Sequence, residues 1–304
     1  MMNHYQQPEY LKNGDKVGFV APAGRINKSL VESAIRQFKD WNYEIVLGKH
    51  IYNTYNSFAG THEERAADLQ DMLDNPDIKA IFCIRGGYGT IRIIDKLDFT
   101  KFIHNPKWLI GFSDISVLHA YINHRLNIQT IHGPMAYIFK NKTENKQSIE
   151  YIRKAIAGEK IHYSFAPVIM ERPDNCSGLL SGGNISVMYS LNNTPFDFNT
   201  DDKILFLEDI GEYYYHLDRM IMNFKMQGKL ENLKALIVGQ MTDFKNSTHD
   251  FGKNAYEIIQ EHVAAYQYPV IYGFPAGHEH PNFPMIFGEN WKLVFNRDTI
   301  DFSL

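Results

Sequence analysis

The chain has 304 residues, of which 44% are apolar and 22% charged, and its formal net charge is −4. This length suits one large domain or two modest ones, and the composition is ordinary for a soluble globular protein. The small net charge and the lack of a Lys/Arg block argue against a nucleic-acid or anionic-membrane partner. No stretch approaches the roughly 18 apolar residues of a membrane span. The polar residues 1–15 also lack the apolar core of a secretion signal, so we expect a cytoplasmic protein.

The two cysteines, Cys83 and Cys176, are too few for a disulfide framework. Cys83 lies within the apolar run 80–84, where it is most simply a buried small side chain. Cysteine usage offers no metal site, and we expect neither a metal nor another cofactor.

Short β-rich runs alternate with helical patterns over the first 135 or so residues. The predicted strands are 16–21, 43–47, 78–84 and 108–111, and the predicted helices are 28–41, 61–73, 90–97 and 116–124. Thr61 followed by Glu64 has the arrangement of a capping box at a helix start. Continuous apolar strands separated by helices predict a parallel sheet covered on both faces, hence an α/β fold.

The second half is also mixed α/β, with more hairpin-like pieces. The polar helical segment 141–157 is interpreted as the link between the halves, which predicts domains at 1–150 and 151–304. The second half begins with residues 163–170. After them we expect a Gly-rich turn at 177–184, strands at 203–207, 235–238 and 270–274, helices at 213–227 and 255–266, and a terminal hairpin formed by 292–295 and 299–302.

Ser113 follows the predicted strand 108–111 and precedes a helical pattern. At such a turn a serine hydroxyl is exposed above the sheet, and the first backbone N–H groups of the helix lie beside it. These donors can hold an oxyanion, so the arrangement suits an acyl-transfer nucleophile. The motif departs from the G-x-S-x-G elbow at Ile115. The simpler interpretation is that Ser113 or Asp114 only caps the helix.

A Gly-rich turn, Arg-Gly-Gly-Tyr-Gly at 85–89, follows the strand 78–84. Its glycines allow a tight turn and can present amides to an anion or a carbonyl oxygen. It matches neither a P-loop nor G-x-G-x-x-G, so phosphate binding has weak support. In an open α/β sheet this turn and Ser113 both lie at the carboxyl ends of strands, where ligand crevices form.

Glu208 ends the strand 203–207, where a carboxylate can accept a hydrogen bond from an imidazole. Asp209 and Glu212 compete for this role, and acids near helix starts are common for dipole reasons alone.

His278 and His280 lie on a loop rich in Gly and Pro. They could bind zinc together with His132, but a general-base or a structural histidine is the simpler interpretation.

Six short motifs together resemble the LD-carboxypeptidase (murein tetrapeptide carboxypeptidase) family. They are Gly-Phe-Ser-Asp-Ile-Ser, Arg-Gly-Gly-Tyr-Gly, Ile-His-Gly-Pro, Leu-Ser-Gly-Gly-Asn, Phe-Leu-Glu-Asp and Gly-His-x-x-Pro-Asn. The resemblance also includes Phe-Ala-Gly-Thr at 58–61 and Arg-Ala-Ala-Asp-Leu at 65–69, and extends from about residue 15 to 291.

This resemblance implies a Ser-His-Glu triad of Ser113, His278 and Glu208, with oxyanion donors from the backbone of Asp114 and Gly86. It also implies a Rossmann-like N-terminal domain that carries the serine, a smaller C-terminal α/β domain that carries the acid and the base, and a homodimer. The order Ser, Glu, His along the chain is compatible with a triad, because triads are recognised by roles and not by order.

The implied activity is hydrolysis of the L,D-bond before the terminal D-Ala of cytoplasmic murein tetrapeptides in cell-wall recycling. A carboxypeptidase must recognise a free carboxylate, and Arg85, Gly87 and Tyr88 of the Gly-rich turn are candidate substrate contacts, although Arg85 could equally be a surface arginine. One alternative is the microcin-immunity branch, which hydrolyses peptidyl or aminoacyl nucleotides and would use an aromatic platform; Tyr189 is available, but no Trp is near it. A different alternative is a non-catalytic peptide- or nucleotide-binding protein.

Overall fold

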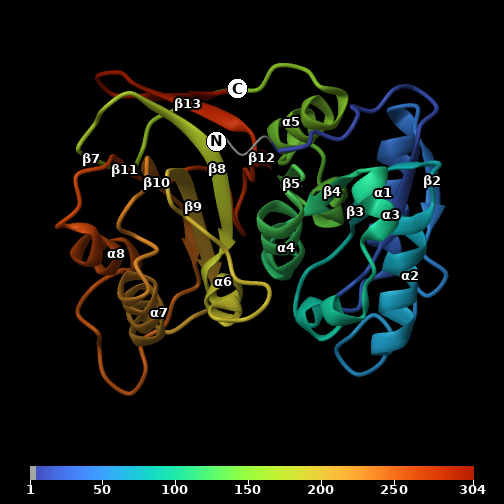
Figure 1. The fold of residues 1–304 in the computed structure, drawn as a ribbon, viewed down its shortest axis with the longest axis horizontal. Coiled ribbons are helices and arrows are strands. Elements are labelled where there is room, and N and C mark those ends of the chain that lie inside the picture. Colours follow the sequence, from blue (N-terminus) through green and yellow to red (C-terminus); the bar gives the residue numbers. More distant parts are fainter. Residues whose placement is uncertain (1–4) are drawn as a thin grey trace. The chain divides into compact units, whose positions relative to one another are not determined.

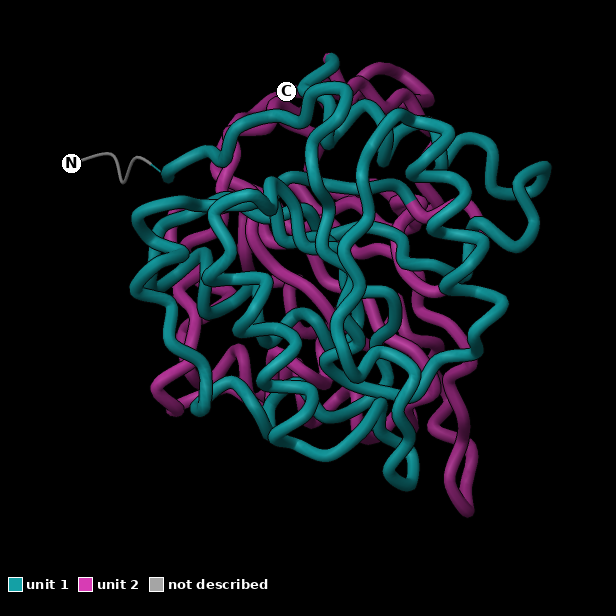
Figure 2. Tube along the Cα trace, turned by 90° about the vertical axis from the view of Figure 1, so that its right-hand side faces the viewer, with its two compact units in different colours: residues 1–159, 283–287 teal, residues 160–282, 288–304 magenta. Residues whose placement is uncertain are grey.

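The computed structural model describes residues 5–304, so residues 1–4 of the polar N-terminal segment lie outside it. The chain forms two compact units (Figures 1 and 2). Unit 1 contains residues 1–159 and 283–287, and unit 2 contains residues 160–282 and 288–304. The unit boundary therefore follows residue 159, where the sequence pattern predicted one near residue 150, and five residues from the second half belong to unit 1. No helix within residues 5–304 is long and apolar enough to cross a membrane.

Unit 1 is built on a six-stranded sheet with the strand order β12-β5-β4-β3-β1-β2. Its strands are β1 (Lys16–Val20), β2 (Glu44–Leu47), β3 (Ile78–Cys83), β4 (Trp108–Gly111), β5 (Thr130–His132) and β12 (Met285–Phe287). Strands β1 to β5 are parallel in the order 2-1-3-4-5, a common order of doubly wound α/β folds. Strand β12 pairs antiparallel with β5 and was not predicted.

The sheet of unit 1 is covered on both faces, as predicted. Successive residues of β4 are all buried, although neighbouring side chains on a strand point to opposite faces. The covering helices are α1 (Lys28–Asp40), α2 (His62–Asp74), α3 (Thr100–His104), α4 (Ser116–Leu126) and α5 (Lys146–Ala157). The capping box of Thr61 and Glu64 is present at the start of α2. The helix predicted at 90–97 is instead two short 3-10 turns, Thr90–Arg92 and Ile94–Lys96.

Unit 2 is built on a mixed eight-stranded sheet with the order β6-β14-β13-β8-β9-β10-β11-β7. Its strands are β6 (His162–Phe165), β7 (Ile169–Glu171), β8 (Cys176–Asn184), β9 (Lys203–Ile210), β10 (Ala235–Thr242), β11 (Val270–Tyr272), β13 (Asn290–Phe295) and β14 (Ile300–Ser303). Strands β8 to β11 are parallel, and the remaining pairs are antiparallel. The predicted terminal hairpin is confirmed as β13 and β14.

One prediction for unit 2 is wrong. The predicted Gly-rich turn at 177–184 is the nine-residue strand β8. Its glycines permit close strand approach, because a Cβ on Gly182 would lie only 1.8 Å from the carbonyl oxygen of Phe206 on β9. The segment 163–170, which begins the second half, contributes to two strands, β6 and β7, at opposite edges of the sheet.

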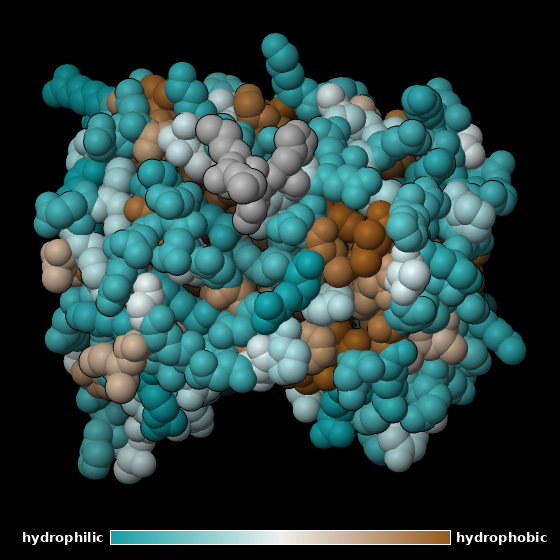
Figure 3. Space-filling model, in the orientation of Figure 1, coloured by the Kyte–Doolittle hydropathy of each residue, from teal (hydrophilic) through white to brown (hydrophobic). Residues whose placement is uncertain are grey.

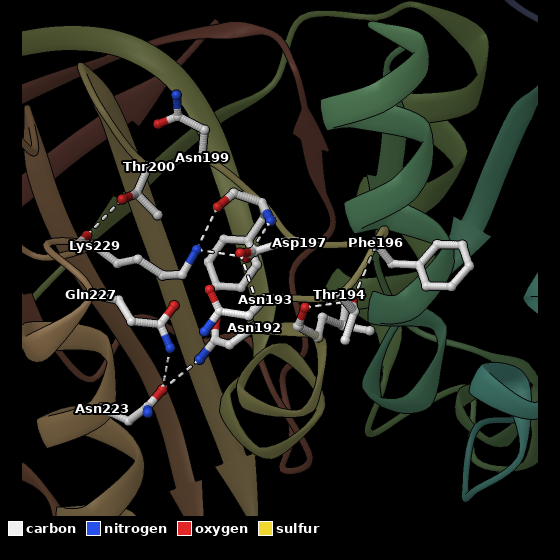
Figure 4. Close-up of polar contacts among 12 residues, drawn as sticks. Asn192, Asn193, Thr194, Phe196, Asp197, Asn199, Thr200, Asn223, Gln227 and Lys229 are labelled. Carbon is white, nitrogen blue, oxygen red and sulfur yellow. Dashed lines mark hydrogen bonds and ion pairs between the residues drawn. The ribbon is translucent and has the colours of Figure 1, made fainter.

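A buried lysine fixes the connection between α6 (Ile185–Leu191) and β9 (Figure 4). Lys229 Nζ donates to Asp197 Oδ1 at 2.7 Å and to the carbonyl oxygen of Phe198 at 2.6 Å, and it lies 4.0 Å from the centre of the Phe198 ring. The connection leads directly into the strand that carries Glu208. Helices α7 (Tyr214–Met226) and α8 (Ala255–Val263) complete unit 2. Hydrophilic side chains make up most of the molecular face in Figure 3, with smaller hydrophobic patches among them.

Candidate active site

Ser113 occupies the predicted strand-to-helix turn of unit 1. Strand β4 ends at Gly111, Ser113–Ile115 form a 3-10 turn, and α4 begins at Ser116. Ser113 has φ of +62°, a left-handed conformation that costs a residue with a Cβ about 1–2 kcal/mol. Backbone strain of this kind is concentrated at functional sites, which favours the nucleophile over the simple helix cap.

The Gly-rich turn lies directly against Ser113. A Cβ placed on Gly86 would lie 3.1 Å from Ser113 Cβ, 3.3 Å from its Oγ and 3.4 Å from the backbone nitrogen of Asp114. Gly87 and Gly89 have φ of +105° and +132°, which only glycine adopts readily. The structure therefore brings together Ser113, Asp114 and Gly86, three of the residues that the sequence singled out.

A buried histidine supports the strand end that precedes Ser113. His119 Nε2 lies 2.8 Å from the carbonyl oxygen of Gly111, and His119 Nδ1 lies 2.8 Å from Thr130 Oγ1. The carbonyl can only accept, so Nε2 carries the proton and Nδ1 accepts from the threonine. Burial lowers the pKa of His119 to about 4, which keeps the ring neutral.

In unit 2, His278 and Glu208 form a hydrogen-bonded pair. His278 Nδ1 lies 2.8 Å from Glu208 Oε2, and the Glu208 side chain is fully buried on β9. The ring nitrogen donates to this carboxylate oxygen, which fixes the imidazole tautomer with Nε2 as the acceptor. This is the tautomer that a general base requires.

The two competing carboxylates have other partners. Asp209 accepts hydrogen bonds from Asn184 Nδ2 at 2.8 Å and from the backbone nitrogen of Ser186 at 2.9 Å. Burial and the neighbouring Glu208 raise the pKa of Asp209 to about 7. Glu212 Oε2 lies 2.6 Å from Nδ1 of His216, which belongs to the first turn of α7. Of the three carboxylates considered, Glu208 is the partner of His278.

The electrostatic surroundings of His278 favour its protonated form. Burial lowers the pKa of the ring, but the charge of Glu208, the hydrogen bond that His278 donates to Glu208 and the charge of Asp209 all raise it. The net pKa of His278 lies above its ordinary value, so the ring is a competent proton acceptor.

Metal ligation has no support in the described structure. Within residues 5–304, no group of three or more His, Cys, Asp or Glu side chains is arranged to hold a metal ion. His132 is fully buried on β5 of unit 1, with its ring 5.1 Å from the ring of Phe287. His132 belongs to unit 1, whereas His278 and His280 belong to unit 2.

Comparisons with known proteins give a family for both halves of the chain. Residues 17–133 match the LD-carboxypeptidase N-terminal domain, and residues 177–293 match the LD-carboxypeptidase C-terminal domain. The chain belongs to the LD-carboxypeptidase family. The family's enzymes are serine-type hydrolases, so the chain is an enzyme and not a non-catalytic binding protein.

The relatives of this LD-carboxypeptidase align over nearly its full length. A "Probable murein peptide carboxypeptidase" of Bacillus subtilis is 31% identical, covering 93% of this chain and 89% of the relative. The "Murein tetrapeptide carboxypeptidase" of Pseudomonas aeruginosa is also 31% identical, covering 93% of this chain and 94% of the relative. The crystal structure of muramoyltetrapeptide carboxypeptidase from Oxalobacter formigenes superposes with a TM-score of 0.85 at 26% identity, covering 95% of this chain and 98% of that structure. A "Microcin C7 self-immunity protein MccF" of Escherichia coli is 25% identical, covering 95% and 93%.

The candidate substrate contacts all lie on the Gly-rich turn of the LD-carboxypeptidase. The Arg85 side chain is exposed, and its Nη1 donates to the carbonyl oxygen of Arg25 at 2.6 Å. Tyr88 is 52% exposed, and its hydroxyl accepts from Arg92 Nε at 3.1 Å. Gly87 is exposed between them. These positions leave Arg85 and Tyr88 accessible to a ligand.

Gln240 on β10 is a supporting residue that the sequence did not reveal. Its Nε2 donates to the carbonyl oxygen of Pro281 at 2.9 Å, and its Oε1 accepts from the backbone nitrogen of Glu279 at 2.7 Å. These two bonds hold the loop on both sides of His280, directly after His278. A glutamine at the end of an apolar strand carries no sequence signal for such a role, because both partners lie about 40 residues away in the chain.

Proposed function

We propose that the chain is a serine carboxypeptidase that cleaves the L,D-peptide bond before the terminal D-Ala of murein tetrapeptides. Ser113 is the nucleophile, His278 the general base and Glu208 the residue that orients His278. The backbone N–H groups of Asp114 and Gly86 are the oxyanion donors. The observation that carries this proposal is the His278–Glu208 pair. Among the three acidic candidates, Glu208 is the one whose hydrogen bond fixes the His278 tautomer that a general base needs.

In the proposed acylation step, His278 Nε2 takes the proton of Ser113 Oγ as this oxygen attacks the scissile carbonyl carbon. Glu208 stabilises the resulting imidazolium, and the two backbone amides stabilise the oxyanion. The C–N bond then breaks, and D-Ala leaves with the proton from His278. A water molecule then attacks the acyl-enzyme while His278 Nε2 takes its proton. His278 returns this proton to Ser113 Oγ, which releases the shortened peptide and regenerates Ser113.

Product analysis by mass spectrometry tests this function. Incubation with a murein tetrapeptide in H₂¹⁸O is expected to give free D-Ala and a tripeptide with one ¹⁸O in its new carboxylate. Ser113→Ala and His278→Gln are expected to lower kcat by roughly 10⁴- to 10⁶-fold.

A matched control is His216→Gln, because His216 also pairs with a glutamate in unit 2, at 2.6 Å. This variant is expected to keep full activity. Full activity of a folded Ser113→Ala variant would exclude the proposed nucleophile, and equal losses in the two histidine variants would exclude the proposed base.

A second candidate function, hydrolysis of aminoacyl or peptidyl nucleotides, is supported by the MccF relative. Tyr189 on α6 contacts the ring of His216 edge to face at 6.1 Å and offers an aromatic surface for a base. Incubation with an aminoacyl-sulfamoyl adenosine separates the two functions: cleavage of this compound with no release of D-Ala from the tetrapeptide favours the second.

The proposal also places the enzyme in the cytoplasm, acting in cell-wall recycling as a homodimer. Cell fractionation tests the location. Light scattering during size-exclusion chromatography tests the dimer, for which a mass near twice 35.2 kDa is expected.

A further inference from the structure

We propose that the Asp114 side chain is a positioning residue that holds the Gly-rich turn at the distance from Ser113 that catalysis requires. This inference rests on the proposed function, in which Gly86 and Asp114 supply the oxyanion donors through their backbone. The carboxylate adds a second role to the same residue: it fixes the segment that carries the other donor.

The Asp114 carboxylate connects the nucleophile turn to the end of the Gly-rich turn. Asp114 is 3% exposed, and its Oδ2 accepts a hydrogen bond from the backbone nitrogen of Thr90 at 2.8 Å. Thr90 follows Gly89 directly and begins the 3-10 turn Thr90–Arg92. The side chain next to Ser113 thus holds a segment 24 residues earlier in the chain.

Two further contacts hold the rest of the turn. The carbonyl oxygen of Gly86 accepts from the backbone nitrogen of Gly24 at 3.0 Å. The carbonyl oxygen of Gly89 accepts from Nη1 of Arg65 at 2.9 Å, and the same nitrogen donates to the carbonyl oxygen of Pro22. A segment with several glycines has many accessible conformations, so contacts at both of its ends are needed to select one.

The charges of Asp114 and Arg65 complement each other inside unit 1. Arg65 is 1% exposed, and each charge stabilises the ionised form of the other. Burial raises the pKa of Asp114, and the hydrogen bonds from Thr90 and Gly89 together with the charge of Arg65 oppose this rise. A buried carboxylate is costly unless it is hydrogen-bonded; Asp114 accepts the bond from Thr90, and the charge of Arg65 stabilises its ionised form.

The distances at Gly86 explain why this arrangement affects the reaction. Gly86 is packed so closely that a Cβ there would lie 3.1 Å from Ser113 Cβ. A shift of the turn by a few tenths of an ångström therefore changes the position of its N–H group relative to the nucleophile. Loss of one oxyanion donor typically costs about 10²- to 10³-fold in kcat.

The test compares Asp114→Ala and Asp114→Asn with the wild-type enzyme, using D-Ala release from a murein tetrapeptide. Both substitutions keep the backbone N–H of residue 114 and change only the side chain. Asp114→Ala is expected to lower kcat by about 10²-fold with KM within about threefold, because a donor to the transition state is lost. Asp114→Asn is expected to lose only about tenfold, because its Oδ1 can still accept from Thr90.

The matched control is Asp68→Ala in the same unit. Asp68 is 4% exposed and likewise accepts from a backbone nitrogen, that of His50, at 2.9 Å. This variant is expected to lower the melting temperature about as much as Asp114→Ala while keeping wild-type kcat below that temperature.

The inference is overturned if folded Asp114→Ala keeps kcat within threefold of wild type, or if Asp68→Ala loses as much kcat. If Asp114→Ala does not fold, the tenfold loss in Asp114→Asn supports the inference, and an unchanged kcat in that variant overturns it. Ser113→Ala is measured in the same series. Full activity of Ser113→Ala would refute the proposed function itself, whereas an inactive Ser113→Ala with an unaffected Asp114→Ala would refute only the positioning role.

Discussion

Replacing Gly86 by alanine adds one methyl group next to the proposed nucleophile. Its Cβ would lie 3.1 Å from Ser113 Cβ and 3.3 Å from Oγ, where ordinary carbon contacts are about 3.5–4.0 Å. Ser113 or the Gly-rich turn must therefore move by a few tenths of an ångström. The φ angle of Gly86 is not in the positive range, so the new side chain adds no backbone strain. We expect the free energy of unfolding to fall by about 1 kcal/mol, the lower end of overpacking costs.

The catalytic cost is expected to be larger than the structural one. A misplacement of 1 Å can lower a rate about 10²-fold, and the loss of an oxyanion donor costs about 10²- to 10³-fold. For a shift of a few tenths of an ångström we expect kcat to fall between about 10- and 100-fold, with KM little changed. Steady-state release of D-Ala from a murein tetrapeptide measures both constants.

The control for this substitution is Gly178→Ala in unit 2. Its Cβ would also meet a neighbour at 3.1 Å, but this neighbour is Cγ of the flexible Lys234 side chain. We expect its kcat to stay within about twofold of wild type. A folded Gly86→Ala variant with wild-type kcat would refute the close coupling between the turn and Ser113.

Three further predictions concern strain and protonation. Ser113→Gly is expected to unfold with a free energy about 0.5–1 kcal/mol higher than Ser113→Ala in urea titrations, because glycine relieves the φ of +62°; equal values would contradict the strain. Because the folded state lowers the pKa of His119 from 6.5 to about 4, the unfolded state binds the proton more readily, and the free energy of unfolding should fall by about 3 kcal/mol as the pH falls from 6.5 to 4. His119→Gln should therefore show a flatter pH dependence of stability. Glu208→Gln removes the largest interaction that raises the pKa of His278, so the acid limb of kcat/KM should move to lower pH while kcat falls about 10²- to 10⁴-fold; an unmoved limb would contradict the pairing.

Local patterns predicted the strands and helices that carry the site. The apolar run before Ser113 and the helical spacing after it placed this serine at a strand end, and the structure has β4 and α4 there. The same kind of evidence placed Glu208 on a strand, but it left Asp209 and Glu212 as competitors. Only the folded positions separate the three: Asp209 neighbours Glu208 on β9 and therefore points to the opposite face, and Glu212 lies beyond the end of β9, next to His216.

Other features depend on contacts between distant residues. The glycines of β8 read as a turn because their need for close approach to Phe206 is visible only in the sheet. Nothing local in residues 163–170 shows that β6 pairs with β14 and β7 with β11. The links from Asp114 to Thr90 and from Gln240 to Pro281 are also long-range, and no residue spacing predicts them.

Strand β12 determines the order in which the molecule can be completed. Its partner β5 ends at residue 132, but β12 is synthesised only after nearly all of unit 2. During synthesis β5 is therefore an open sheet edge, which another strand could pair with in error. A cut between the two sequence domains leaves the first without this strand. Exchanging the two sequence halves between proteins would therefore separate β12 from its partner β5, because the unit that contains Ser113 includes residues 283–287.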